Sequence, residues 1–433
     1  MKIAILGYGI EGQAAYDHWH EGNEITICDQ NASIQLPDGV ASQLGQDYLG
    51  GLDQFDLIVR SPNLHPRDIV AANGEAVLPK VTSNTNEFLK VCPTKNIIGV
   101  TGTKGKGTTS TLITKMLEAD GHKVHLGGNI GIAPLELLKN SIQPDDWVIL
   151  ELSSYQLVDL HYSPTIALCL LLEPEHLDWH ADLDEYIEAK SNLFRQQTTE
   201  DKAVYFSGND YSVQIASAGN GQKIPYFSVP GALVKDNSVK IGDQAICQTS
   251  ELKLPGRHNW QNVCAAVTVV WQITQNIEAM RSVLTTFAGL PYRIEFRAEK
   301  NGIRYYNDSF ATGAPATIAA VEAVVEPKVL IVGGYDRMLP LENLAEFLKQ
   351  QSSLRKVLVI GASSERLIRS LEAVGFDNFE RSESKTMSEI VAQATALAQP
   401  GDAVLLSPAF ASFDMFKNFE ERGRMFNEAV ETL

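Results

Sequence analysis

The chain has few of the features that mark secreted or membrane-bound proteins. Its five cysteines form no CxxC pair or other metal-type cluster, so they indicate free thiols in a reducing cytoplasm. Its longest strongly apolar run, residues 166–172, is far too short to span a bilayer, which argues against membrane insertion. Residues 1–6 run directly into a glycine turn, and we therefore expect no signal peptide.

Positive charge is also scarce. The 433 residues include 36 Lys and Arg but 53 Asp and Glu, which gives a net charge of −17. This balance argues against nucleic acid as a partner and favours solubility, although local loops can still hold anionic ligands. The length predicts about three domains at ~150 residues each.

A stretch rich in glycine and lysine at residues 96–111, NIIGVTGTKGKGTTST, is the first strong signal. An apolar strand is expected at residues 97–100 and a helix at residues 112–121. Between them, glycines let backbone N–H groups face a phosphate, a lysine adds positive charge, and a hydroxyl can hold Mg²⁺. Gly107 stands where a hydroxyl residue normally follows the lysine, so the metal-facing hydroxyl is assigned to Thr108. The predicted nucleotide contacts are Gly102, Thr103, Lys104, Gly105, Lys106, Gly107, Thr108 and Thr109.

A second glycine-rich turn lies near the start of the chain. A strand at residues 2–6 leads into GYGIEG at residues 7–12, and a helix follows at residues 13–21. A further strand at residues 24–28 ends at Asp29, which completes the pattern of a dinucleotide-binding fingerprint. This pattern is compatible with NAD(P), with another nucleotide, or with a Rossmann-like unit that binds none.

Two later strands end in potential metal ligands. A strand at residues 147–150 ends in Glu151, and the strand at residues 166–172 ends in EPEHLDWH, residues 173–180. A carboxylate at the end of a strand, opposite a phosphate loop, is well placed to hold Mg²⁺. From composition alone, residues 173–180 are equally compatible with an exposed acidic turn.

The remaining sequence alternates strand and helix patterns. Strands at residues 329–332, 356–360 and 403–406 are separated by helical patterns, which predicts a further doubly wound sheet. The predicted fold class is α/β with three domains: a Rossmann-like N-terminal domain, a central P-loop ATPase-type domain and a C-terminal Rossmann-like domain.

A set of motifs along the chain resembles those of one enzyme family. They are TGTKGK at 101–106, LGGNIGI at 126–132, ELSSYQL at 151–157, GRHNWQN at 256–262, GLPYRIE at 289–295, NDS at 307–309 and SPAFASFDMFKNFEERG at 407–423. The set resembles the Mur ligases, ATP-dependent enzymes of peptidoglycan synthesis, and most closely the members that add glutamate to UDP-N-acetylmuramoyl-L-alanine. The resemblance implies a UDP-substrate-binding domain at residues 1–93, an ATP-binding domain at residues 94–290 and an amino-acid-binding domain at residues 291–433.

The resemblance also implies roles for individual residues. It assigns catalysis to Lys106, His176 and Lys190. It assigns the metal site to Thr108, Glu151, His176 and Lys190, with Lys190 carbamylated by CO₂. Nucleotide contacts beyond the loop fall to Asn259, Asn262, Arg293 and Asp308, whereas His258 is expected to be structural. Substrate contacts fall to Gly9, Ile10, Asn129, Ser153, Gln156, Arg337, Ser412 and Phe419. Without the resemblance, the pattern around Lys190 indicates a solvated lysine on a helix.

The implied reaction requires ATP and Mg²⁺. ATP phosphorylates the substrate carboxylate to an acyl phosphate, and the amine of glutamate then displaces phosphate. D-Glutamate is favoured and L-glutamate is the alternative, because Phe310 replaces the usual lysine after NDS and departs from the family pattern. The implied setting is the cytoplasm, where the protein would act as a monomer in the cell-wall synthesis that supports cell shape and division.

Three other interpretations are compatible with parts of the sequence. A folylpolyglutamate synthase-like ligase shares the GKG order of the phosphate loop but lacks the N-terminal Rossmann-like unit and the SPAFAS tail. A nicotinamide-dependent dehydrogenase would rest on GYGIEG alone. A non-catalytic nucleotide-binding protein is allowed by the two departures from the family pattern, Gly107 and Phe310.

Overall fold

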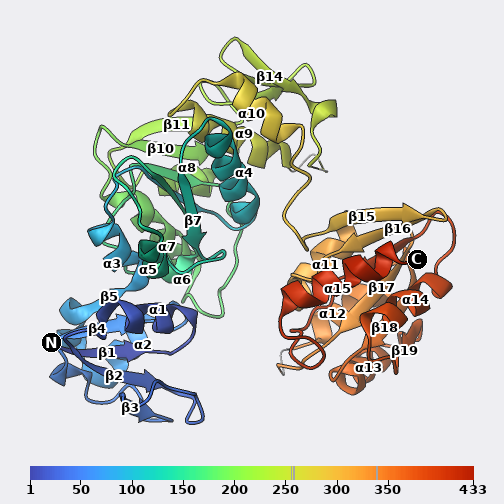
Figure 1. Ribbon diagram of the computed structural model, residues 1–433, viewed down its shortest axis with the longest axis horizontal. Helices are drawn as coiled ribbons and strands as arrows, with labels where there is room; N and C mark the ends of the chain where they lie inside the picture. Colours follow the sequence, from blue (N-terminus) through green and yellow to red (C-terminus); the bar gives the residue numbers. More distant parts are fainter. Residues whose placement is uncertain (255, 257–258, 338–339) are drawn as a thin grey trace. The chain divides into compact units, whose positions relative to one another are not determined.

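A computed structural model describes residues 1–254, 256, 259–337 and 340–433. The chain divides into two compact units, Met1–Ala288 and Gly289–Leu433. Figure 1 shows each unit as strands layered against helices. The first unit contains two large sheets, and a domain boundary at residue 93 stays a prediction, as does the boundary at residue 290.

The first unit begins with a five-stranded parallel sheet in the order β3-β2-β1-β4-β5. Its strands are β1 (Lys2–Leu6), β2 (Glu24–Asp29), β3 (Ala41–Leu44), β4 (Leu57–Arg60) and β5 (Val81–Ser83), and its helices are α1 (Ile10–Trp19), α2 (Pro66–Asn73) and α3 (Asn84–Val91). Short 3₁₀ helices lie at Leu52–Gln54 and Glu75–Lys80. The helix after β1 packs closely on the turn, because a Cβ on Gly12 would lie 2.0 Å from the Gly7 carbonyl oxygen.

A six-stranded parallel sheet follows in the order β11-β10-β9-β6-β8-β7. Its strands are β6 (Ile97–Thr101), β7 (Val124–Gly128), β8 (Trp147–Glu151), β9 (Ile166–Cys169), β10 (Lys202–Phe206) and β11 (Gln222–Tyr226). The helices are α4 (Lys106–Ala119), α5 (Pro134–Leu137), α6 (Ser154–Leu157), α7 (Leu183–Arg195), α8 (Asp210–Ala216), α9 (Asn259–Trp271) and α10 (Ile277–Leu284), with 3₁₀ helices at Leu138–Asn140 and Thr249–Glu251. A small antiparallel sheet comprises β12 (Leu233–Lys235), β13 (Ser238–Ile241) and β14 (Gln244–Gln248).

One hydrophobic core connects the two large sheets of the first unit. It contains Ile5 of β1, Leu150 of β8 and Ala167 of β9, together with Leu135 of α5. Apolar side chains from both sheets are therefore removed from water in a single cluster, which stabilises the unit as one body.

The second unit has a six-stranded sheet in the order β15-β16-β20-β17-β18-β19. Its strands are β15 (Glu295–Lys300), β16 (Ile303–Asn307), β17 (Lys328–Gly333), β18 (Leu354–Ile360), β19 (Phe379–Arg381) and β20 (Ala403–Leu406). Its helices are α11 (Ala314–Ala323), α12 (Glu342–Gln350), α13 (Ser364–Ala373), α14 (Met387–Leu397) and α15 (Phe419–Glu431). The pair β15 and β16 is antiparallel and the other pairs are parallel.

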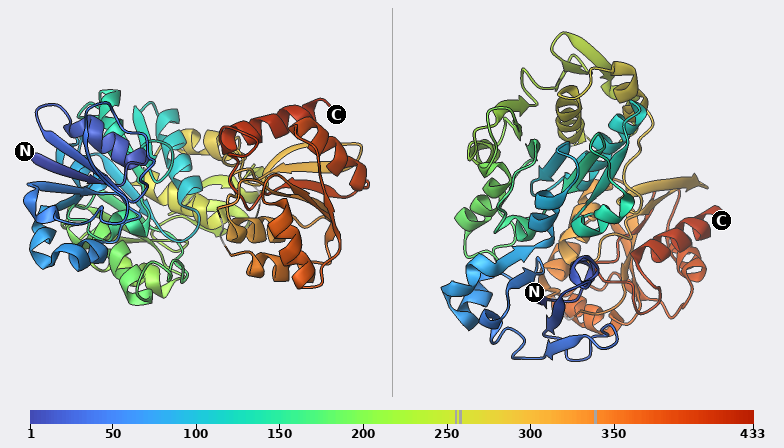
Figure 2. Two further views of the ribbon diagram at one scale, coloured as in Figure 1. Left: turned by 90° about the horizontal axis from the view of Figure 1, so that it is seen from below. Right: turned by 60° about the vertical axis from the view of Figure 1, so that its left-hand side comes forward.

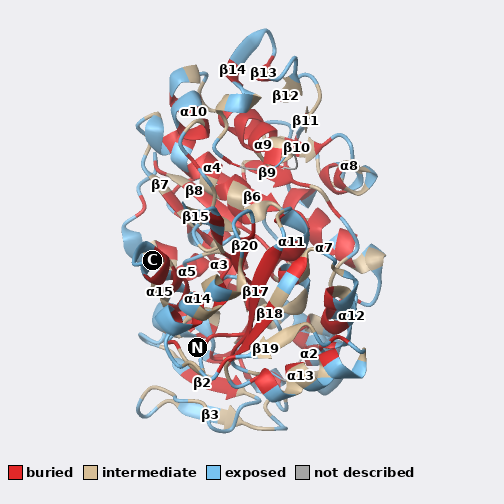
Figure 3. Cartoon of the chain, turned by 90° about the vertical axis from the view of Figure 1, so that its right-hand side faces the viewer, coloured by how far each residue is buried: buried red, intermediate tan, exposed pale blue. Residues whose placement is uncertain are grey.

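Alternate residues of the central strands pack on opposite faces of this sheet. Leu330 and Val332 of β17 belong to a core with α11, α12 and α13, whereas Val329 and Ile331 belong to a core with α14 and α15. Figure 2 shows helices on both sides of the sheet, and Figure 3 shows β17 and β18 buried between them. Strands buried on both faces explain the continuous apolar runs in the sequence.

Two helices begin earlier than the sequence predicted. α4 begins at Lys106 rather than at residue 112, and α1 begins at Ile10 rather than at residue 13. In both cases a glycine, Gly105 or Gly9, immediately precedes the helix, so the turn passes directly into it. The lysine and hydroxyl residues of the phosphate loop therefore lie in the first turn of α4. Within the described ranges, every helix is too short or too polar to cross a membrane.

Candidate active site

The predicted phosphate loop lies between β6 and α4. Residues 102–105 form the turn and residues 106–109 form the first helical turn, so the predicted contacts surround one helix N-terminus. Gly105 has a φ of +87°, and a Cβ there would lie 2.2 Å from the Asn262 Oδ1 atom, which excludes a side chain. Free backbone N–H groups and the helix dipole make such an N-terminus a site for anions.

Asn259 and Asn262 reach this loop from α9. Asn262 Nδ2 donates to Asn259 Oδ1 at 2.8 Å, and the Asn262 side chain faces Gly105. The two asparagines predicted to contact the nucleotide therefore lie together, one of them directly on the loop. His258, which was expected to be structural, lies outside the described residues.

Lys106 curls back over the loop that precedes it. Its Nζ atom donates to the carbonyl oxygens of Gly102 at 3.0 Å and Thr103 at 3.1 Å. In the same helical turn Thr108 is half-buried. The hydroxyls of Thr109 and Ser110 are buried and lack a hydrogen-bond partner within the described part of the chain. This turn thus combines the positive charge of Lys106 with the half-buried Thr108.

The phosphate loop is tied to the acidic segment that follows β9. The Thr103 hydroxyl lies 3.0 Å from the Tyr186 hydroxyl and donates to the Glu173 carbonyl, while the Glu173 N–H donates to the Thr103 oxygen at 2.9 Å. Lys104 forms an exposed ion pair with Glu173 at 3.0 Å. These contacts place the start of residues 173–180 beside the loop.

Lys190 of α7 lies beneath the phosphate loop. Its side chain is fully buried, and Nζ donates to the Thr101 hydroxyl at 3.3 Å and to the Gly102 carbonyl at 3.2 Å. The Nζ atom also lies 4.7 Å from the centre of the Tyr186 ring. Burial, followed by repulsion from Lys106, lowers the pKa of Lys190 to about 7. Its surroundings thus differ from those of a solvated lysine on a helix.

Glu151 stands at the end of β8, where the sequence placed a metal ligand. Its Oε1 atom accepts a hydrogen bond from Asn129 Nδ2 at 2.9 Å. Its Oε2 atom is buried and has no hydrogen-bond partner among the residues that the structure describes. A buried carboxylate oxygen without a partner destabilises the fold, and a bound cation would remove that penalty.

His176 lies in the acidic segment with an unusual backbone conformation. Its φ is +60°, and its ring centre lies 5.0 Å from that of Tyr155. Its Nε2 atom is 3.5 Å from a Glu175 carboxylate oxygen. Burial lowers the pKa of His176, while Glu175 opposes that shift, so a neutral ring with a free lone pair is favoured.

Four predicted substrate residues of the first unit lie at two turns, while the fifth, Asn129, contacts Glu151. Gly9 precedes α1 and Ile10 begins it, with Ile10 exposed to 70%. Ser153 and Gln156 form a capping box at the start of α6. Sequence reasoning missed Glu11, which accepts a hydrogen bond from Gln156 Nε2 at 2.7 Å and so connects the two turns. An acidic residue inside GYGIEG was the only signal for it.

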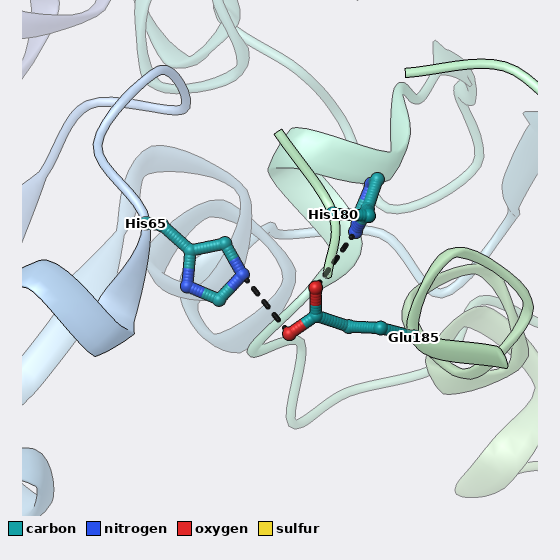
Figure 4. Close-up of side chains that lie close together, drawn as sticks. All are labelled: His65, His180 and Glu185. Carbon is teal, nitrogen blue, oxygen red and sulfur yellow. Dashed lines mark ion pairs between the residues drawn. The ribbon is translucent and has the colours of Figure 1, made fainter. Parts of the chain in front are cut away.

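A cluster of His65, His180 and Glu185 has the composition of a metal centre (Figure 4). Its candidate ligand atoms all lie within 4.8 Å of one another, and both histidines are buried. Glu185 is 3.3 Å from His65 Nε2 and 3.6 Å from His180 Nδ1. No local pattern predicted that these three residues meet, because His65 is more than 100 positions from its partners.

The hydrogen bonds around the cluster do not fit a metal ion. His65 Nδ1 caps α2 and accepts a hydrogen bond from the Arg67 N–H at 3.1 Å, so the proton of the neutral ring sits on Nε2. A metal-bound histidine instead donates through its other nitrogen. The Arg67 guanidinium, 3.5 Å from Glu185, also repels a cation. The cluster therefore serves as a polar contact between α2 and α7.

In the second unit, Arg293 stacks on Phe310. The guanidinium carbon of Arg293 lies 4.0 Å from the centre of the Phe310 ring, a cation–π contact. The Phe310 ring lies 5.2 Å from that of Phe419, nearly perpendicular to it. Arg293, Phe310 and Phe419 thus form one cluster.

Asp308 lies close to this cluster and is buried. It accepts hydrogen bonds from the Ser407 hydroxyl at 2.7 Å and from the Ile294 N–H at 3.2 Å. Burial raises the pKa of Asp308 to about 7, although both bonds and the charge of Arg293 oppose the rise.

A pocket that is open to solvent lies near the carboxyl end of the same sheet. Arg337, Tyr335 and Phe410 line it. Ser412 is buried and follows the pocket-lining residue Ala411. The structure thus gathers the predicted amino-acid contacts Arg337 and Ser412 at one pocket region, whereas Phe419 belongs to the Arg293 cluster.

The chain matches known proteins along its whole length. Residues 100–270 match the Mur ligase middle domain, and residues 292–410 match the Mur ligase, glutamate ligase domain. The UDP-N-acetylmuramoylalanine–D-glutamate ligase of Clostridium kluyveri is 36% identical over 100% of this chain and 97% of its own length.

Solved structures of lower identity share the fold. The UDP-N-acetylmuramate-alanine ligase MurC from Thermotoga maritima has a TM-score of 0.56 at 17% identity and covers 100% of this chain and 99% of its own. The MurF ligase from Thermotoga maritima, solved with ADP, has a TM-score of 0.57 at 18% identity, with coverage of 99% and 94%. The predicted α/β class is confirmed.

Proposed function

The chain belongs to the Mur ligase family, and from this premise we propose that it joins D-glutamate to UDP-N-acetylmuramoyl-L-alanine, with ATP converted to ADP and phosphate. The observation that carries the proposal is the 36% identity, over the whole chain, to a ligase of that name. A dehydrogenase that shared only GYGIEG would not match from end to end. A folylpolyglutamate-type ligase is disfavoured for the same reason.

The phosphate loop would bind ATP through the N-terminus of α4. Lys106 now contacts two loop carbonyls, and its ammonium group would exchange these contacts for phosphate oxygens. Asn259 and Asn262 would contact the nucleotide from α9, and Arg293 and Asp308 would contact it from the second unit. Charge that develops on the transferring phosphoryl group would be stabilised by Lys106 and Arg293.

Mg²⁺, when bound, would neutralise phosphate charge and orient the phosphates for transfer. Thr108, Glu151, His176 and Lys190 would hold it, with Lys190 acting through the oxygens of a carbamate. The donor set fits a cation, because a buried oxygen of Glu151 has no hydrogen-bond partner among the described residues and because burial favours the neutral ring of His176.

Lys190 has the chemistry needed for carbamylation. Its pKa near 7 leaves a large share of the amine neutral at neutral pH, and a neutral amine is the nucleophile that attacks CO₂. The nitrogen lone pair forms a bond to carbon, one N–H proton leaves to solvent, and a carbamate anion results. The carbamate would place negative charge beneath the loop, close to Lys106.

The ligation then takes two balanced steps. A carboxylate oxygen of the sugar nucleotide attacks the γ-phosphorus of ATP. The bond between this phosphorus and the bridging oxygen breaks, and ADP leaves with that oxygen. The amine of D-glutamate attacks the resulting acyl phosphate at carbon, phosphate leaves, and the nitrogen loses a proton. Arg337, Ser412 and Phe419 would position glutamate, and the forked guanidinium of Arg337 suits a carboxylate.

The proposal also assigns a role to each of the three parts of the chain. Residues 1–93 would bind the UDP portion of the substrate, with Gly9 and Ile10 at its glycine turn. Residues 94–290 would bind ATP and present Asn129, Ser153 and Gln156 to the substrate. Residues 291–433 would bind glutamate. The protein would work in the cytoplasm as a monomer, without nucleic acid as a partner.

The test is phosphate release with ATP, Mg²⁺, UDP-N-acetylmuramoyl-L-alanine and either enantiomer of glutamate. We expect release only when all components are present, faster with D-glutamate, together with a product heavier by one glutamate residue in mass spectrometry. Release that does not depend on the sugar nucleotide would overturn the proposal.

A further inference from the structure

Glu11 makes a contact that the proposed roles do not explain. It lies in the first turn of α1, next to Ile10, and its Oε1 atom accepts a hydrogen bond from Gln156 Nε2 at 2.7 Å. Gln156 is 145 positions further along the chain, in α6. This bond joins the two turns of the first unit that are proposed to contact the sugar nucleotide.

The Gln156 amide is oriented from both of its ends. Its Oε1 atom accepts a hydrogen bond from the Ser153 N–H at 3.0 Å, and the Ser153 hydroxyl lies 3.2 Å from the same atom. An amide nitrogen cannot accept a hydrogen bond from an N–H, so the nitrogen has to point away from Ser153. Glu11 offers it a carboxyl oxygen as the acceptor. Together the two partners permit one of the two amide orientations.

The Glu11 carboxyl group is held in an unfavourable environment. Part of the residue is exposed, but its Oε2 atom is buried and has no hydrogen-bond partner in the described ranges. Burial raises the pKa of Glu11 to about 7, although the Gln156 bond and the charge of Arg60 oppose this. Arg60 is paired with Asp159. A buried, half-paired carboxyl group destabilises a fold, and such groups concentrate at functional sites.

The backbone of Glu11 is anchored as well. Asn84 Nδ2, at the start of α3, donates to the Glu11 carbonyl oxygen at 2.9 Å. The side chain therefore projects from a fixed backbone position toward α6 and acts as a spacer of defined length between the turns.

We propose that Glu11 is a positioning residue for the ligase reaction, which fixes the Gln156 amide and holds the Ser153–Gln156 turn against the Gly9 turn for joint contact with the sugar nucleotide. The inference rests on the proposed function. It predicts that removal of the acceptor weakens sugar-nucleotide binding and leaves ATP binding intact.

Kinetics of three variants test this role. Glu11→Ala removes the acceptor, Glu11→Gln keeps a carbonyl oxygen for Gln156 Nε2, and Glu21→Ala removes a carboxylate from an exposed position just beyond the same helix. We expect Glu11→Ala to raise the KM for UDP-N-acetylmuramoyl-L-alanine about tenfold and to change the KM for ATP less than twofold, in line with loss of one buried hydrogen bond. Glu11→Gln and Glu21→Ala should stay within twofold of wild type for both.

Two kinetic outcomes would overturn the proposal. One is a Glu11→Ala enzyme whose KM for the sugar nucleotide is unchanged while kcat falls, because a lower folded fraction produces that pattern. The other is a Glu11→Gln enzyme with a KM shift as large as that of Glu11→Ala. If Glu11→Ala does not fold, Glu11→Met takes its place, because it keeps the length of the side chain and removes the oxygen acceptor.

A crystal structure of each Glu11 variant separates this inference from the proposed function. We expect the Gln156 amide to leave Ser153 in Glu11→Ala and to keep its orientation in Glu11→Gln. An unchanged Gln156 in Glu11→Ala would refute the positioning role, whatever the enzyme catalyses. Failure of the wild-type protein to release phosphate would instead refute the proposed function and leave this structural readout valid.

Discussion

Lys190 Nζ lies 3.2 Å from the Gly102 carbonyl oxygen, so a fully buried amine donates a hydrogen bond to the backbone of the phosphate loop. The same loop carries Lys106, whose charge contributes to the lowered pKa of Lys190. Lys190 can therefore lose its proton and react with CO₂.

Lys106→Ala should reduce phosphate release by about a hundredfold or more, because it removes positive charge where negative charge develops on the phosphoryl group. Lys115→Ala is the matched control, since Lys115 is an exposed lysine in the same helix α4. Near-normal release by Lys106→Ala would show that this loop does not serve the reaction.

Lys190→Ala should lose most activity, and short carboxylic acids such as formate or acetate should restore part of it. The physical reason is that a small carboxylate can occupy the space and supply the charge of the missing carbamate. The measurement is phosphate release across a titration of each acid, with Lys115→Ala as the control for general salt effects. A fully active Lys190→Ala enzyme would exclude a functional carbamate.

Thr108→Val should shift the Mg²⁺ titration of phosphate release to higher concentrations, because it removes the hydroxyl assigned to the metal and preserves the shape of the side chain. Thr111→Val, one helical turn further along α4, is the control. Superimposable titrations of the Thr108 variant and wild type would assign the metal-facing hydroxyl elsewhere.

Glu11 should make the stability of the protein fall with rising pH. Its pKa is about 7 in the folded state against an ordinary value of 4.5, so the folded state binds more protons between these values. The stabilisation is complete below the ordinary pKa and is lost as pH rises through about 7. Relative to Glu11→Gln, wild type should lose about 2 kcal/mol between pH 5 and pH 8.

Urea unfolding of both proteins at several pH values measures this difference, and other titrating groups cancel in the comparison. Stability curves that stay parallel from pH 5 to pH 8 would show that the Glu11 carboxyl group titrates normally in the folded state.

The parts that the sequence could predict are those set by local patterns. The phosphate loop follows from glycines, lysines and hydroxyls within a few positions, and the strands follow from short apolar runs. The helices α4 and α1 begin earlier than predicted, at Lys106 and at Ile10, because the glycine turns pass directly into them. A strand that ends at Asn307 was predicted and is β16, but its antiparallel partner β15 and the small sheet β12–β14 were not. None of the residues of β15 or of the three-residue strand β12 is fully buried, so neither strand has a buried apolar run.

Contacts between distant segments could not be predicted from the residues themselves. The bond between Glu11 and Gln156 depends on how α1 and α6 meet, and no local pattern records it. The burial of Lys190 depends on the packing of α7 beneath β6, so its residue type alone indicated a surface position. Only the resemblance to the Mur ligases singled it out.

Phe310 is the residue on which the choice of glutamate enantiomer is expected to depend. Its ring holds the Arg293 guanidinium at 4.0 Å and packs edge-to-face on Phe419, a proposed glutamate contact. Phe310→Lys would place a second cation beside Arg293, and repulsion would displace one of the two side chains. D- and L-glutamate can bind with their carboxylates in the same positions only if the amine or the side chain points in a different direction. Such a displacement should therefore act differently on the two enantiomers.

Initial rates with each enantiomer, for wild type, Phe310→Lys and Phe310→Tyr, test this dependence. We expect wild type to use D-glutamate strongly in preference to L-glutamate, and Phe310→Lys to be slower and less selective. Phe310→Tyr keeps an aromatic face for Arg293, so it should retain the preference of wild type. Faster turnover of L-glutamate by wild type would contradict the D-glutamate assignment. An unaltered preference in Phe310→Lys would show that selectivity arises without Phe310, which would leave the pocket lined by Arg337, Tyr335 and Phe410 as its source.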